Sequence, residues 1–280
     1  VALGGCFLLP LPLLVGYQFR VLKLSAAGAP RPFPEWEDWG GLFVDGLQLG
    51  VEQYDPYPVN DVVGPVQIGD YYSGQYYLDG LVDEVTVFQR ALAATELAAL
   101  HAAGSAGMLP PQCTVPPEGL VAWWRGEGDG RDATGNHAGS LMYDATFTNG
   151  FTGSAFAFDG VDDLVTVADA RPLRLTNALT IQFWARRQRV GIDFALEKGG
   201  DWTDGQCNYG VGLHELNNRM FYFTFNGGWR GTDGPADFNW HHYAVTARHG
   251  DANPELYIDG TRRSVAHSGG VGTINLTGNS

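Results

Sequence analysis

A short polar loop, residues 132–137, has the residue types that a hard cation prefers. Its sequence, Asp-Ala-Thr-Gly-Asn-His, places a carboxylate, an amide and backbone carbonyls on one tight turn. Calcium binds through oxygen atoms of these kinds. The loop is therefore a candidate calcium site. An Asx-type turn, in which the aspartate accepts hydrogen bonds from nearby amides, explains the same residues without a metal.

Two other polar clusters are weaker metal candidates. Residues 159–163 read Asp-Gly-Val-Asp-Asp, which we interpret as a hairpin turn rather than a site, because Asp-Gly is typical of tight turns. His241 and His242 are adjacent, and adjacent residues of a strand point to opposite faces. We therefore expect core packing for one histidine and a solvent-facing position for the other.

Two stretches, residues 201–206 and 226–230, combine tryptophan with polar side chains in expected loops. Sugar-binding faces need exposed aromatic rings for stacking and nearby polar groups that bond the hydroxyls. Alternatively, each tryptophan only covers an edge of the fold. Four other tryptophans lie in alternating strands and are expected in the core: Trp123, Trp124, Trp184 and Trp240. The predicted ligand-binding residues are Trp202, Asp204, Gln206, Asn226, Trp229 and Arg230.

The composition indicates an all-β fold with a sizeable core. The 280 residues are 44% hydrophobic and 17% charged, so a core can form. The 39 glycines, 15 prolines, 12 tyrosines and 8 tryptophans are typical of many short strands joined by tight turns.

Charge and cysteine content exclude several function classes. A net charge of −14 with only 17 lysines and arginines argues against binding nucleic acid. Three cysteines, Cys6, Cys113 and Cys207, are too few for a disulfide framework, although Cys113 and Cys207 could pair. The apolar opening, residues 1–15, is interpreted as a degraded export signal or, alternatively, as a strand or a fragment edge, and it is too short to span a membrane.

One strand-and-turn pattern occurs twice. Residues 41–46, Gly-Leu-Phe-Val-Asp-Gly, are echoed by residues 255–260, Glu-Leu-Tyr-Ile-Asp-Gly. Downstream, residues 66–68 and 274–276 each have apolar residues two apart, as a strand with one buried face requires. We interpret the chain as two incomplete copies of one β domain.

The elements between these copies follow from periodicity. Alternation over residues 81–88 predicts a strand, and leucine spacing over residues 91–101 predicts a helix that ends at Gly104. A linker rich in Gly, Ser and Pro follows. Further strands are predicted over residues 119–124, 155–158, 163–167, 179–186, 209–214, 220–225 and 241–247.

These residues resemble the laminin-G-like domains, concanavalin A-type jelly-roll sandwiches often found in tandem on bacterial secreted and surface proteins. The resemblance implies an all-β sandwich with one short helix. The segments that carry it are residues 119–124 (Gly-Leu-Val-Ala-Trp-Trp), 132–139, 156–163, 179–184, 240–245, 256–260, and 81–85 followed by 90–92.

The resemblance divides the chain in an unusual way. Residues 41–107 resemble the C-terminal part of a first repeat, and residues 118–280 the N-terminal part of a second, with a linker over 108–117. Residues 1–40 stay unassigned. Since residues 41–107 and 118–258 together hold one full set of strands, we expect a single circularly permuted sandwich across the repeat boundary. This requires Asp83 to lie near Trp123 and Asp132.

The resemblance also implies a calcium site. In similar proteins the polar loop and the aspartate of the closing strand can share a structural calcium. Carried over to this chain, Asp132, Asn136 and the carbonyl of His137 would meet Asp83.

Catalysis is not expected. Glycoside hydrolysis needs two carboxylates held about 5 to 9 Å apart. The related glucanases carry a Glu-x-Asp-x-x-Glu type strand, which residues 35–38 and 83–84 approach without matching. The Gly-x-Ser-x-Gly elbow and the P-loop are also missing from the sequence.

The sequence therefore predicts a non-catalytic module that binds carbohydrate or serves adhesion, outside the cell or at its surface. Its expected partners are a glycan or a surface protein, with structural calcium as the cofactor. The alternatives are a structural spacer repeat and an accessory domain of a glycoside hydrolase, because one fold hosts many functions.

Overall fold

The computed structural model describes residues 64–71, 76–104, 117–199, 209–214, 220–270 and 272–277. They belong to one compact unit, Val59–Ser280. Several predictions lie outside these residues: the segment 1–40, the first copy of the repeat at 41–46, the three cysteines, and the ligand candidates Trp202, Asp204 and Gln206.

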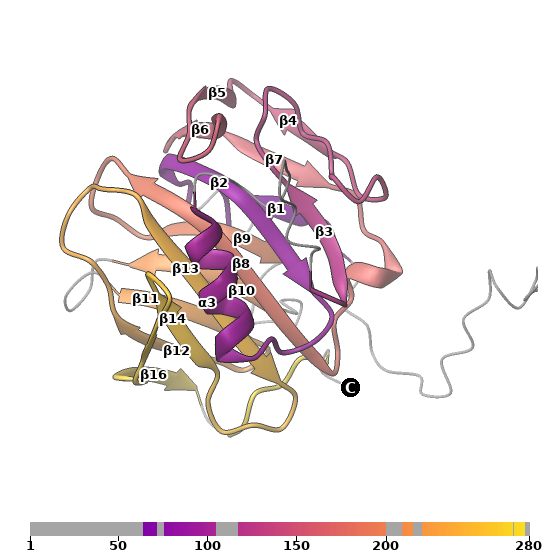
Figure 1. The fold of residues 1–280 in the computed structure, drawn as a ribbon, viewed down its shortest axis with the longest axis vertical. Coiled ribbons are helices and arrows are strands. Elements are labelled where there is room, and N and C mark those ends of the chain that lie inside the picture. Colours follow the sequence, from indigo (N-terminus) through magenta and orange to yellow (C-terminus); the bar gives the residue numbers. More distant parts are fainter. Residues whose placement is uncertain are drawn as a thin grey trace, which may run out of the picture. The chain divides into compact units, whose positions relative to one another are not determined.

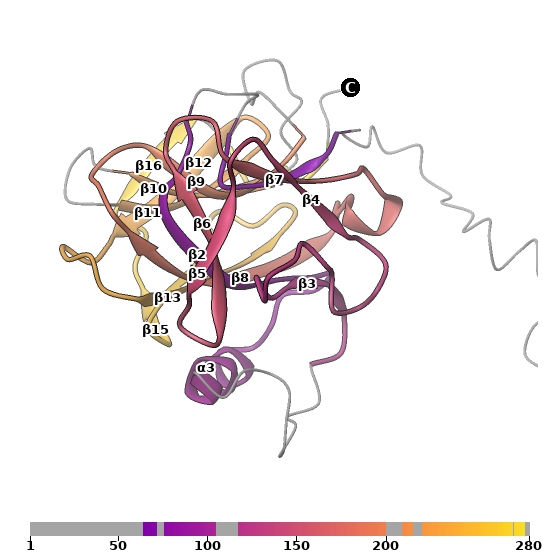
Figure 2. The ribbon, with the colours of Figure 1, turned by 90° about the horizontal axis from the view of Figure 1, so that it is seen from above.

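Two antiparallel sheets face each other, so the predicted all-β sandwich is confirmed (Figures 1 and 2). Sheet 1 has the order β16 (His267–Gly270), β12 (Gly228–Asp233), β11 (Met220–Phe225), β10 (Tyr209–His214), β9 (Asp193–Lys198), β1 (Val66–Ile68), β7 (Leu164–Val167), β4 (Gly139–Met142). Sheet 2 has the order β15 (Thr261–Arg263), β14 (Glu255–Ile258), β13 (His241–Arg248), β8 (Ala178–Arg187), β2 (Asp79–Phe88), β6 (Ser154–Asp159), β5 (Thr146–Asn149), and β3 (Leu120–Trp124) also pairs with β2.

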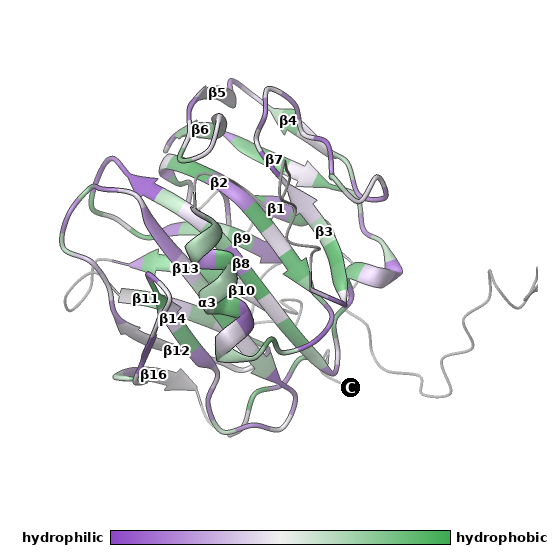
Figure 3. Cartoon of the chain, viewed as in Figure 1, coloured by the Kyte–Doolittle hydropathy of each residue, from purple (hydrophilic) through white to green (hydrophobic). Residues whose placement is uncertain are grey.

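The core lies between the sheets and follows from alternation along the strands. Phe221, Phe223 and Phe225 of β11 point inward, and Phe183 of β8 meets Phe221 edge-on at 6.4 Å between ring centroids. Apolar residues run along the strands while polar residues gather in the loops (Figure 3). Trp124 is fully buried in this core, so alternation identified it correctly.

Strand β2 occupies a central position in sheet 2. It pairs with β8 on one side and with β6 and β3 on the other, and residues 80–88 are buried. Val85 of β2 is opposite Trp124, which also forms a bridge with Asp132. Both sheets therefore combine strands from residues 64–104 with strands from residues 117–277. That these two parts come from consecutive repeats remains a prediction.

Helix α3 (Ala94–Ala103) packs on the outer face of sheet 2 (Figure 2). Leu97 and Leu100 bury their side chains in a cluster that includes Trp123 and Tyr257.

The helix starts three residues later than expected and ends at Gly104, as predicted, where φ is 50°. In the described part of the chain, no helix is long and apolar enough to cross a membrane.

Three local expectations need correction or sharpening. The expected loop at residues 226–230 is a tight turn followed by β12, so Trp229 and Arg230 lie in a strand. The segment 159–163 is not a hairpin, since β6 belongs to sheet 2 and β7 to sheet 1. The Asp259-Gly260 turn has φ of 50° and 68°, as the predicted type I′ hairpin between β14 and β15 requires.

Candidate functional site

The carboxylate of Asp132 organises its own loop. Oδ1 accepts hydrogen bonds from the backbone amides of Trp123 (2.8 Å) and Thr134 (2.9 Å). Oδ2 accepts from the amides of Asn136 (3.3 Å) and His137 (3.0 Å), and from the Thr134 hydroxyl. With both oxygens occupied by N–H and O–H donors, this carboxylate is the centre of an Asx-type turn.

The other two ligands predicted in this loop make hydrogen bonds of different kinds. The carbonyl of His137 accepts the indole N–H of Trp124 at 2.7 Å. The amide of Asn136 donates to the carbonyl of Thr134 at 3.3 Å. Protein donors thus occupy both oxygens of Asp132 and the carbonyl of His137, which the sequence interpretation gave to calcium. An ion in this loop would have to compete with these donors.

Asp83 lies in a different environment, at an irregularity of β2. The register of β2 against β8 shifts between Asp83 and Thr86, and Glu84 has a φ of 55°. Such a bulge redirects the side chains next to it. Asp83 is fully buried: its Oδ2 accepts the amide of Thr152 at 2.8 Å, and within the described residues its Oδ1 has no hydrogen-bond partner.

A second carboxylate approaches the same turn. Glu127 accepts the amide of Ser154 at 3.2 Å, two residues after the amide that bonds Asp83. A Cβ at Gly150 would lie 2.7 Å from Oδ2 of Asp83, so only glycine lets the backbone come this close to the carboxylate. Asp83, Glu84 and Glu127 are called the acidic junction below.

Burial makes the acidic junction electrostatically costly. Burial raises the pKa of Asp83 to about 7. The nearby carboxylates of Glu84 and Glu127 also raise this pKa, whereas the hydrogen bond from the Thr152 amide lowers it. Burial likewise raises the pKa of Glu84 to about 7, although the Trp123 indole donates to it at 2.6 Å. Arg125 is 3.8 Å from both Glu84 and Glu127 and is the only basic side chain that the described residues pair with these carboxyls.

The acidic junction meets the chemical requirements of a calcium site better than the Asp132 loop does. It offers a buried carboxylate oxygen without a partner, a second carboxylate, and a glycine-containing turn pressed against them. A divalent cation would offset the cost of burial, and the smaller like-charge repulsion, that raise the pKa values of Asp83 and Glu84. Asp83 and Glu127 are therefore the residues that could hold calcium. The sequence analysis identified Asp83 but missed Glu127. Nothing in the sequence near Glu127 indicates that the fold brings it to the segment that also bonds Asp83.

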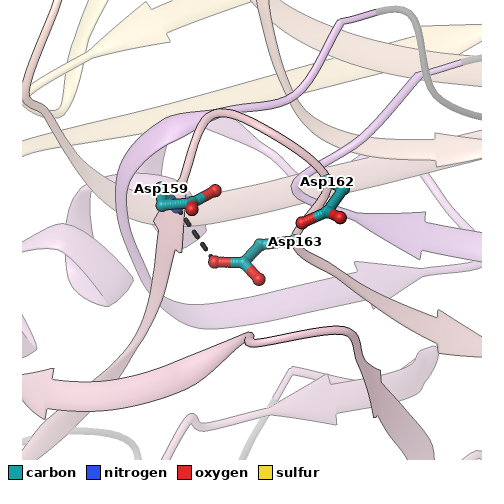
Figure 4. A group of neighbouring side chains, drawn as sticks. All are labelled: Asp159, Asp162 and Asp163. Atoms are coloured by element: carbon teal, nitrogen blue, oxygen red, sulfur yellow. Dashed lines mark hydrogen bonds between the residues drawn. The ribbon is translucent and has the colours of Figure 1, made fainter.

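The three aspartates of residues 159–163 form another acidic group (Figure 4), with one ligand atom from each lying within 4.8 Å of the others. Asp159 accepts the amide of Val161 at 2.8 Å, and Asp163 accepts the amide of Asp159 at 3.0 Å. These are turn-forming bonds, so they support the interpretation of this segment as a turn, here one that crosses between the sheets.

The outer face of sheet 1 carries an aromatic cluster. Tyr71 stacks on Phe194 with 4.0 Å between ring centroids, and Tyr222 meets Phe194 edge-on at 5.4 Å. These three rings are buried, while Tyr76 and Trp229 at the margin of the cluster are half-buried. These five residues are called the outer aromatic cluster. Alternation in β11 was the sequence signal, since Tyr222 and Thr224 separate the three inward phenylalanines.

A row of mostly polar positions crosses the same face. Strand register aligns Gln67 with Glu197, Glu197 with Gly210, Gly210 with Thr224, and Thr224 with Trp229. Of the polar side chains in this row, Gln67 is half-buried, whereas Glu197 and Thr224 are buried. The face therefore offers two half-buried groups of the kinds that sugar recognition uses, the indole of Trp229 and the amide of Gln67.

Of the three described ligand candidates, only Trp229 reaches solvent to a useful extent. Arg230 is buried and its guanidinium donates to the carbonyls of Trp229, Gly269 and Gly272. Asn226 is also buried, and its amide donates to the carbonyl of Thr277 at 2.8 Å. Both side chains are buried and donate hydrogen bonds to backbone carbonyls, so neither is placed for direct contact with a ligand.

The two adjacent histidines diverge as the strand geometry predicted. His241 lies between Asp259 (2.8 Å) and Asp237 (2.9 Å), whereas His242 is buried 2.5 Å from the Gln182 side chain. Burial lowers the pKa of His242 to about 3, so it stays neutral. The pair does not chelate one ion.

Comparison with known families gives two matches. The model of the concanavalin A-like lectin/glucanases superfamily matches residues 37–98 and 159–280, about two thirds of the chain. A family described as a protein of unknown function (DUF4013) matches residues 1–51. Searches of curated proteins and of solved structures returned no significant match.

Proposed function

Because the chain belongs to the concanavalin A-like lectin/glucanase superfamily, we propose that it is a non-catalytic carbohydrate-binding module that acts outside the cell. The observation that carries this proposal is the outer aromatic cluster, with Trp229 half-buried at its margin beside polar positions of sheet 1. Domains of this kind are typically extracellular, and the acidic composition fits that setting.

The glycan contacts the outer face of sheet 1. The indole of Trp229 and the ring of Tyr76 stack on the C–H faces of pyranose units, while the half-buried Gln67 bonds hydroxyls. Tyr71, Phe194 and Tyr222 support the rings from below, because they are already buried against one another.

Calcium is the proposed cofactor, held by Asp83 and Glu127 rather than by Asp132. When bound, the ion supplies positive charge that stabilises the ionised carboxylates of the acidic junction. Its role is structural: Asp83 lies on central strand β2 of sheet 2, whereas the proposed glycan contacts lie on sheet 1.

The proposal assigns no catalysis to the chain. Asp83 and Glu84, the described residues nearest to a glucanase motif, bond Thr152 and Trp123 within the structure. A structural spacer repeat is the second candidate function. The burial of Tyr71, Phe194 and Tyr222 favours it, since these rings are satisfied without a ligand.

A glycan array probed with the intact chain in calcium tests the two candidates. Trp229→Ala should weaken any binding by about tenfold, which corresponds to the loss of one stacked ring. Trp240→Ala is the matched control, because Trp240 is also half-buried but lies next to sheet 2, edge-on to Phe151 and close to Arg186. An array without signal, or equal losses in both variants, would favour the spacer.

A further inference from the structure

The described residues 64–71 and 76–104, called the closing segment below, attach to the rest of the sandwich through many noncovalent contacts. Strand β2 lies between β8 and the β6 and β3 strands, and β1 lies between β7 and β9. Helix α3 adds Leu97 and Leu100 to a cluster with Trp123 and Tyr257. The closing segment is therefore inserted into both sheets rather than added at an edge.

The acidic junction spans the boundary between the closing segment and the rest. Asp83 comes from the closing segment, and Glu127 comes from the part that follows residue 117. The amides of Thr152 and Ser154 hold these two carboxylates at one turn. Docking β2 thus brings Asp83 into a site that already has a carboxylate of like charge.

The boundary has no matching cation among the described residues near Asp83. Arg125 is 3.8 Å from Glu84 and from Glu127, and no hydrogen bond or ion pair joins Asp83 to a basic side chain in the described part. The uncommon φ of 55° at Glu84 adds a local backbone cost at the same point. A group that gains its ligands only when both parts are in place would offset these costs.

We propose that a divalent cation, bound between Asp83 and Glu127, fastens the closing segment to the rest of the sandwich and so makes docking of β2 dependent on that ion. This inference rests on the calcium site of the proposed function. It adds that the ion controls attachment of a segment, not only local order of a loop.

The test uses the full chain with a specific protease site inserted between Gly104 and Pro117. After cleavage, one piece is labelled, and its exchange with unlabelled cut protein is followed in calcium and in chelator. The dissociation constant of the two pieces should fall about 100-fold when free calcium is 100 times its own Kd, because the ion binds only the assembled form. Equal exchange with and without calcium would overturn the inference.

Two variants separate the proposed contact from general stability. Asp83→Asn should remove the calcium response of the cut protein. Asp79→Asn is the matched control: Asp79 lies on the same strand and faces Arg189 across the same boundary at 3.7 Å, so its loss should leave the calcium response intact. If Asp83→Asn does not fold, Glu127→Gln, with a partly exposed side chain, replaces it. A calcium response that persists in Asp83→Asn or in Glu127→Gln contradicts the inference.

Calorimetry on the uncut chain distinguishes the failure of this inference from the failure of the proposed site. Calcium binding without an effect on exchange rejects only the fastening role. No binding of calcium to the uncut chain rejects both the site and the fastening role. The glycan array is read independently of either result.

Discussion

Two aspartates of this chain, Asp132 and Asp83, invite the same calcium interpretation but lie in opposite circumstances. Asp132 accepts four backbone amides and one hydroxyl, so its charge is stabilised by the protein itself. Asp83 accepts one amide, has one oxygen without a partner, and lies near two other carboxyls. A buried carboxylate is thus a metal candidate when the backbone fails to satisfy it, not merely because it is acidic.

The largest expected effect is at Asp132. Asp132→Ala should lower the free energy of unfolding by about 3 kcal/mol or more, because several buried donors lose a charged acceptor at once. Urea denaturation in calcium and in chelator measures this loss, which should be the same in both. A loss confined to the calcium sample would mean that Asp132 binds the ion. The proposed difference between Asp132 and Asp83 would then be wrong.

The pH dependence of stability should reveal the acidic junction. The pKa of Asp83 rises from 3.8 to about 7 on folding, and that of Glu84 from 4.5 to about 7. The folded state therefore binds more protons than the unfolded state between about pH 4 and pH 7, and stability should fall as pH rises through that range. Urea denaturation in chelator across this pH range measures the fall, and added calcium should reduce it.

Asp83→Asn sharpens the same comparison. In chelator at pH 8 it should raise the free energy of unfolding by about 1 kcal/mol, since it removes a buried charge without changing the shape of the side chain. Thermal unfolding in chelator measures the change. A destabilised variant whose pH profile matches the parent would show that the charge of Asp83 is already balanced.

A change at His241 should give the smallest effect on stability. Unlike Asp83, His241 lies between groups of opposite charge, which favour its charged form. Partial burial alone would lower its pKa, but hydrogen bonds to Asp237 and Asp259 raise it overall. Its contribution is therefore fully present below about pH 6.5 and is lost as pH rises through the raised pKa of the folded state.

His241→Gln should cost about 0.5 kcal/mol at pH 6 and less at pH 8, because Asp237 and Asp259 are both well exposed and solvent screens the pairs. Urea denaturation at the two pH values provides the measurement. An equal cost at both would mean that packing, not charge, explains the role of His241.

Local sequence patterns determine much of this fold. Alternation predicts strand β2 and the inward aromatic residues of β11, because a strand with one buried face must alternate. Leucine spacing and Gly104 predict α3, and Asp259-Gly260 predicts its hairpin. Trp240 was expected in the core, but it lies just before β13 and is half-buried. The exact start of a strand depends on where its partner strand begins to pair, which the local sequence does not show.

Only the tertiary structure decided how the oxygens of the candidate sites are used. The sequence places Asp132 in a calcium-like loop, yet the amides of Trp123 and His137 reach its carboxylate only after β3 and the loop have packed. Similarly, Asp83 and Glu127 are distant in sequence and meet because both reach the turn before β6. Residue type sets which ligands are available, whereas hydrogen-bond satisfaction is a property of neighbours in space.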